Sequence, residues 1–216
     1  MRPASPSTAD RPEPDGPIPE AALAAIEAHL RERERRREEL YHRARRLRRL
    51  AQSTMARTHS SGRPPPELAE VRSALAELSQ ALRADGRADE PLALDALQEA
   101  VEACLLGAIV DGGPVPTPSA LGVDPEPYLL GLGDVVGEVR RLVVDCLGRE
   151  ALADAERYLA LMGRLTEVLL RFDTARAIVQ LKPKQDQARG LLERTRGELA
   201  MARLLLRATP RDRERP

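Results

Sequence analysis

Aromatic residues are nearly absent from this chain of 216 residues, which has no tryptophan, one phenylalanine and three tyrosines. The core must therefore be built from Leu, Ala and Val, which favour helices over strands. The two cysteines, Cys104 and Cys146, lack metal-type spacing, and a reduced cytoplasmic interior explains them better than a disulfide does. No apolar run approaches the ~20 residues of a membrane span, and the polar, proline-rich N-terminus does not resemble a signal peptide. These shortages predict an all-α, cytoplasmic protein without a membrane segment.

The chain also has no net charge and only three histidines. The 34 basic and 34 acidic residues cancel, so any basic surface for nucleic acid must be local. The three histidines, His29, His42 and His59, fit no metal-binding spacing and no catalytic triad, so we interpret each of them as a surface residue. Their predicted absence from the acidic cluster described below argues against a di-iron carboxylate bundle, which uses Glu-x-x-His pairs.

Apolar residues at three- and four-residue spacing predict a bundle of about six to seven helices. The first helix begins at Glu20, and its middle, from Arg31 to Glu39, is charged nearly all round. Its apolar stripe consists of Leu23, Ile26, Leu30, Leu40, Ala44, Leu47, Ala51 and Met55. Further long helices are expected over about 67–84, 92–110, 125–147, 150–171 and 185–207, with a short turn near Ala120 and a helix stop at Gly148. We predict one helical domain over residues 20–208, flanked by disordered tails at 1–19 and 209–216.

Two pairs of acids stand out within apolar helices. Glu99 and Glu102 are three residues apart in "LQEAVEACLLGA", and Asp134 and Glu138 are four apart in "PYLLGLGDVVGEVRR". Each spacing places both carboxylates on one face of its helix. If the two helices pack side by side, four carboxylates converge, and a divalent cation such as Mg²⁺ or Mn²⁺ is the usual compensation.

Spacing alone leaves a second interpretation open, in which these acids are solvated helix faces. Asp145 illustrates why spacing is insufficient, since it lies on nearly the same face as Asp134 but about 16 Å along the axis. Asp95 shares a face with the other pair of acids, but its place near a helix start also suits interaction with the helix dipole. Neither residue is included in the predicted site.

Three separated motifs resemble the translin family, specifically its translin-associated factor X (TRAX) branch. They are "PYLLGLGDVVGEVRR", "LQEAVEA" and "KQDQARGLLERTRGEL" (184–199), and the resemblance covers roughly residues 20–208 in order. It implies an all-α fold that assembles into a hollow oligomer and binds single-stranded RNA and DNA. The factor X branch carries the acidic set and cleaves RNA with Mg²⁺. The resemblance therefore implies that Glu99, Glu102, Asp134 and Glu138 are the catalytic and metal-binding residues.

There are two departures from the family pattern. Gly133 and the two valines at 135–136 stand where the family more commonly has Ala and Leu-Thr, which are mild changes. Pro183, in "LKPK", stands where the family more often has a basic helical start, so the local conformation there is left open. None of the four acids is missing.

A local basic segment is the candidate contact for nucleic acid. "HRARRLRRL" (42–50) contains no acid, and its five arginines cover more than one helix face. Some of them can reach phosphates while others pair with acids of neighbouring helices, and phosphate contacts carry little sequence information. The predicted nucleic-acid-binding residues are Arg43, Arg45, Arg46, Arg48 and Arg49. The shortage of aromatics argues against extensive base stacking.

The sequence thus predicts a Mg²⁺-dependent endoribonuclease that cleaves single-stranded RNA by a metal-activated water, within a homo-oligomer that is most simply an octamer. Two other classes stay open. One is a non-catalytic, translin-like protein that binds single-stranded RNA or DNA. The other is a structural helical bundle whose acids are merely solvated.

Overall fold

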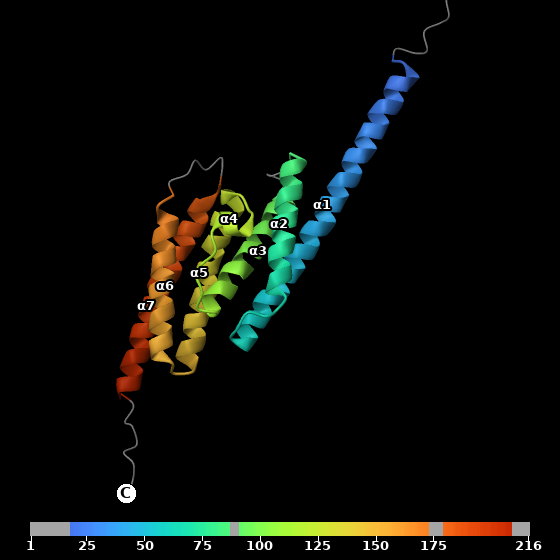
Figure 1. Ribbon diagram of the computed structural model, residues 1–216. Helices are drawn as coiled ribbons and strands as arrows, with labels where there is room; N and C mark the ends of the chain where they lie inside the picture. Colours follow the sequence, from blue (N-terminus) through green and yellow to red (C-terminus); the bar gives the residue numbers. More distant parts are fainter. Residues whose placement is uncertain (1–17, 87–90, 173–178, 209–216) are drawn as a thin grey trace, which may run out of the picture. The chain divides into compact units, whose positions relative to one another are not determined.

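The computed structural model describes residues 18–86, 91–172 and 179–208, and all regular structure within them is helical. Figure 1 shows the helices in chain order. They are α1 (Glu20–Ser61), α2 (Leu68–Ala84), α3 (Pro91–Val110), α4 (Pro118–Leu121), α5 (Pro125–Gly148), α6 (Leu152–Leu170) and α7 (Leu181–Ala208). The all-α prediction is confirmed. The predicted tails lie outside the described residues, apart from the exposed Ile18 and Pro19.

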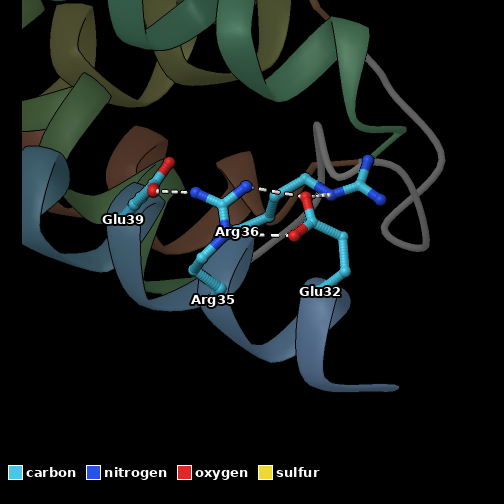
Figure 2. Close-up of polar contacts among 4 residues, drawn as sticks. All are labelled: Glu32, Arg35, Arg36 and Glu39. Carbon is cyan, nitrogen blue, oxygen red and sulfur yellow. Dashed lines mark hydrogen bonds and ion pairs between the residues drawn. The ribbon is translucent and has the colours of Figure 1, made fainter. Parts of the chain in front are cut away.

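The chain divides into two compact units, residues 1–39 and residues 40–216. The described part of the first unit consists mainly of the N-terminal half of α1, whose charged side chains pair along their own helix. Figure 2 shows Arg35 between Glu32 and Glu39, with the Arg36 side chain also on Glu32. Leu23, Ile26 and Leu30, which belong to the predicted apolar stripe, are exposed here.

The second unit is built around α5. This helix packs against α3 on one side and against α6 and α7 on the other, while α2 packs on α3 (Figure 1). The core is aliphatic, as predicted, and includes Leu75, Leu105 and Val135. The C-terminal part of α1 contributes a buried stripe to this core at Leu40, Ala44, Leu47 and Ala51, continued by Thr54 and Thr58.

Both cysteines are buried and free, in agreement with the prediction of isolated thiols. Burial raises the pKa of the Cys104 thiol to about 11, so it is a packing residue and not a nucleophile at neutral pH. Within the part of the chain that the structure describes, no helix is long and apolar enough to cross a membrane.

Helix α5 ends at Gly148, the predicted stop, and the left-handed backbone after it is at Glu150 (φ 58°). One helix boundary differs clearly from the prediction. The last helix begins at Leu181 instead of near Gln185. Pro183 therefore lies in the first turn of α7, where a backbone N–H has no acceptor within the helix and its loss costs little. This earlier start brings Lys184 into the helix.

Candidate functional site

Close packing of α3 on α5 brings the four predicted acids to one place. The two helices approach closely at Gly131, because a Cβ at this position would lie 2.8 Å from the backbone oxygen of Gln98 and 2.8 Å from the side chain of Val101. Any larger residue would force the two helices apart. Glu99 and Glu102 of α3 therefore face Asp134 and Glu138 of α5.

Glu102 lies at the centre of this cluster and is 9% exposed. Burial, followed by the negative charges of Asp134, Glu138 and Glu99, raises the pKa of its carboxyl to about 8. All three neighbouring carboxylates thus lie near enough to Glu102 to affect its ionisation. At neutral pH the Glu102 carboxyl is mostly protonated in the absence of another cation.

Asp134 is held from two helices. Lys184 of α7 donates to its Oδ1, and the Gln98 side-chain amide of α3 donates to its Oδ2. Lys184 reaches this position because Gly133 has no side chain. A Cβ at Gly133 would lie 2.8 Å from the Cβ of Lys184. Gly133, which appeared to be a mild departure from the family pattern, is therefore required for the contact between α5 and α7 at the site.

Glu138 is paired with His59, from the last turn of α1. The hydrogen bond from His59 and the charges of His59 and Arg141 lower the pKa of Glu138, against the opposing effect of burial. A carboxylate can only accept, so His59 donates through Nε2. Its Nδ1 is buried and has no hydrogen-bond partner among the described residues.

The interpretation of His59 as a surface residue is wrong, since its side chain is 4% exposed and contacts the acidic cluster. The argument against a di-iron site that relied on absent histidines loses this premise, although His59 itself has Ala56, not a Glu, three residues before it. Sequence reasoning missed His59 because the histidine lies 79 residues from its partner. His29 and His42 are exposed, as predicted.

Glu99 is the fourth acid, and α1 supplies its partners. The Gln52 amide donates to Glu99 Oε1 at 3.3 Å, and Nε of Arg48 lies 3.7 Å from the same oxygen. Arg48 also forms an ion pair of 3.0 Å with Asp95. Arg48, which was predicted to bind nucleic acid, therefore contacts acids of α3 instead. Asp95, near the start of α3, forms an ion pair with Arg48.

The chemical type of the four acids suits a hard divalent cation, because all four are carboxylates and they come from two adjoining helices. Their present rotamers do not form a coordination sphere. Within the described ranges, no three His, Cys, Asp or Glu side chains are grouped closely enough to hold a metal ion. Asp134, Glu138 and Glu99 are each turned toward a donor of their own. Metal binding would require these side chains to rotate away from their present donors.

The other four arginines of the basic segment are exposed and differ in their surroundings. Arg43 and Arg46 line a groove of about 600 Å³ between α1 and α2, which also contains Glu70 and Glu77. Acids on the far wall reduce the attraction of this groove for phosphates. Arg45 and Arg49 do not line it. They are four residues apart on one face of α1 and are the better placed pair for a phosphate backbone.

Comparison with known proteins identifies the fold. No protein-family model matches the chain. The uncharacterized protein MJ0175 of Methanocaldococcus jannaschii is 41% identical over 103 residues, so the match spans 47% of this chain and less than half (46%) of that protein.

Solved structures cover far more of the chain. The crystal structure of apo-NeC3PO matches with a TM-score of 0.75 and 21% identity, over 86% of this chain and 98% of that one. The structure of AfC3PO in complex with duplex RNA matches with a TM-score of 0.71 and 28% identity, over 87% of this chain and 100% of that one. These neighbours are C3PO proteins of the translin family. The fold implied by the sequence resemblance is therefore the fold observed: a translin-like helical bundle.

Proposed function

We propose that this protein is a Mg²⁺-dependent endoribonuclease of the translin-associated factor X kind, acting on single-stranded RNA within a hollow homo-oligomer. The observation that carries the proposal is Glu102, a buried carboxyl surrounded by three others. Burying an acid among like charges is costly, and a bound divalent cation would relieve that cost. A solvated helix face has no such cost to relieve.

Glu99, Glu102, Asp134 and Glu138 would hold the ion, with Mn²⁺ as an alternative to Mg²⁺. When bound, the ion supplies Lewis acidity toward the phosphodiester and lowers the pKa of the attacking water. The protein orients the carboxylates. His59 and Gln52 donate to Glu138 and Glu99 from α1, as outer hydrogen-bond donors to metal ligands commonly do. Glu102 must release its proton to become a ligand, so metal affinity should rise with pH up to about 8.

RNA as the substrate class is supported by the neighbour AfC3PO, whose structure contains duplex RNA. The form of the RNA is open to a direct test with labelled single strands and matched duplexes. Cleavage of the single strand in Mg²⁺, its loss in EDTA and products with 5′-phosphate ends are the expected results. If neither the single strand nor the duplex is cleaved, either in Mg²⁺ or in EDTA, the proposal is contradicted.

A non-catalytic RNA-binding function is the second candidate. The observation in its favour is that three of the four acids are already paired with Lys184, His59, Gln52 or Arg48, so the cluster is partly compensated without metal. RNA binding that persists in EDTA while no cleavage occurs in Mg²⁺ would select this function.

The contribution of the basic segment can be measured separately. Replacing Arg45 and Arg49 by Ala should weaken RNA binding and reduce the slope of log affinity against log salt by roughly 1 to 2. Arg43→Ala with Arg46→Ala is the matched control, since it removes the same charge from the groove shared with acids. Light scattering tests the oligomer, for which we expect an octamer, and a stable monomer would exclude it.

A further inference from the structure

Lys184 lies inside the acidic cluster, although it belongs to a different helix from all four acids. Its ammonium contacts Oδ1 of Asp134, while Gln98 takes Oδ2. Both oxygens of one predicted metal ligand are therefore occupied by donors from the protein. The positive charge also acts on Glu102, where it opposes the effect of the neighbouring carboxylates. A cation thus already stands among the four acids.

The fold holds this lysine in place through its stem. The absent side chain of Gly133 leaves the space in which the Cβ of Lys184 lies, and the early start of α7 at Leu181 directs the residue toward α5. The Lys184 and Asp134 side chains are 24% and 19% exposed, so water screens their contact less than it screens a surface ion pair. The contact is a built feature of the helix packing.

The partners of the other acids differ from Lys184. His59 can keep donating to Glu138 when the other oxygen of that carboxylate binds an ion. Arg48 is 3.7 Å from Glu99 and is engaged by Asp95. Lys184 places a full, compact positive charge on an oxygen that the metal needs, and a divalent cation at that position would repel it.

We propose that Lys184 is a tethered cation that occupies the position of the divalent ion at Asp134 and must move aside when metal binds. This inference rests on the proposed function, because it assumes that the four acids bind metal. Lys184 is a positioning residue in this scheme. It stabilises the metal-free cluster and lowers the affinity for metal.

The test is a titration of the metal-free, full-length protein with Mn²⁺, in which free ion is measured by electron paramagnetic resonance. Lys184→Met keeps most of the stem and removes the charge, and we expect it to bind Mn²⁺ about tenfold more tightly than the wild type. Lys182→Met is the matched control. It removes the same charge from the same turn of α7, but Lys182 pairs with the exposed Asp186, so its Mn²⁺ affinity should equal that of the wild type.

Thermal unfolding provides a second readout that damage to the fold would not reproduce. Metal-free Lys184→Met should unfold at a lower temperature than the wild type, and Mn²⁺ should raise its midpoint by more than it raises that of the wild type. Unchanged or weaker Mn²⁺ binding by Lys184→Met, beside a wild type that binds, overturns the inference and leaves the metal site intact. If neither protein binds Mn²⁺ more than Asp134→Asn does, the proposed function fails as well.

Discussion

Charged side chains are paired in two different ways in residues 20–39 and around Glu102. In the N-terminal half of α1, Arg35 bonds to Glu32 and Glu39 within its own helix, and all three side chains are largely exposed. Around Glu102, the partners come from other helices: Lys184 reaches Asp134 across 50 residues, and His59 reaches Glu138 across 79.

This difference separates charges that solubilise a helix from charges that build a site. Exposed pairs three or four residues apart gain little, because water screens them and each side chain loses freedom. Half-buried pairs between helices are screened less, and loss of one partner leaves the other charge uncompensated. Substitutions in the two regions should therefore have very different consequences.

The largest effect is expected on catalysis. Glu102→Gln and Asp134→Asn keep size and shape but remove a charge that the proposed function assigns to metal binding, so each should reduce Mg²⁺-dependent RNA cleavage by about a thousandfold, or ~4 kcal/mol in barrier height. The measurement is a single-turnover cleavage assay. Oligomer size and RNA affinity in EDTA serve as controls and should stay close to those of the wild type.

Wild-type cleavage rates in both variants would remove the four acids from the catalytic machinery. The interhelical charge pairs around Glu102 would then serve helix packing and not catalysis.

The next effect is on stability and depends on pH. The pKa of the Glu102 carboxyl is about 8 in the folded protein, against an ordinary value of 4.5. Because the unfolded chain releases this proton at lower pH than the folded protein, the contribution of Glu102 to stability is full below pH 4.5 and is lost as the pH rises toward 8. Glu102→Gln does not titrate, so in EDTA it should exceed the wild type in unfolding free energy at pH 7 by up to about 3 kcal/mol.

Urea unfolding at pH 4, 7 and 8 measures this difference. We expect it to be small at pH 4 and largest at pH 8. A constant difference across that range would mean that Glu102 ionises as a solvent-exposed acid does.

A smaller effect is expected from the pair of His59 and Glu138. His59→Ala removes a buried donor and leaves Glu138 without it, which should cost about 1–2 kcal/mol of unfolding free energy. In a double-mutant cycle with Glu138→Gln, the two changes should be non-additive by a similar amount. Strict additivity would show that the contact contributes nothing to stability.

Much of the fold could be predicted because helix periodicity is local information. The ends of α2, α3 and α5 follow from leucine and valine spacing and from the glycines and prolines between them. The start of α7 could not be predicted in this way, since "LKPK" is compatible with a loop or with a first turn and only packing against α5 decides between them. Exposure of Leu23, Ile26 and Leu30 was also unpredictable, because an apolar stripe does not reveal whether anything covers it.

The site was predictable in part for the same reason. Acid pairs at three- and four-residue spacing locate a face on each helix, and the strong burial of Glu102 is consistent with the two faces meeting. Lys184, His59 and Gln52 could not be recognised as partners, because each lies on a different helix from the acid that it contacts and no spacing rule links them. A weak signal existed in Gly133, where a missing side chain marks a close approach of another segment.

The smallest effect is expected in the N-terminal half of α1. Arg35→Ala breaks the contacts with Glu32 and Glu39 shown in Figure 2, yet the unfolding midpoint should stay within the scatter of repeated measurements. Arg48→Ala is the matched comparison in the same helix, since its loss leaves Asp95 unpaired and removes positive charge near Glu99. It should lower the midpoint measurably at low salt. If both substitutions lower the midpoint equally, the distinction between local and interhelical pairs does not hold, and the charges of residues 20–39 contribute to stability as much as those around the site.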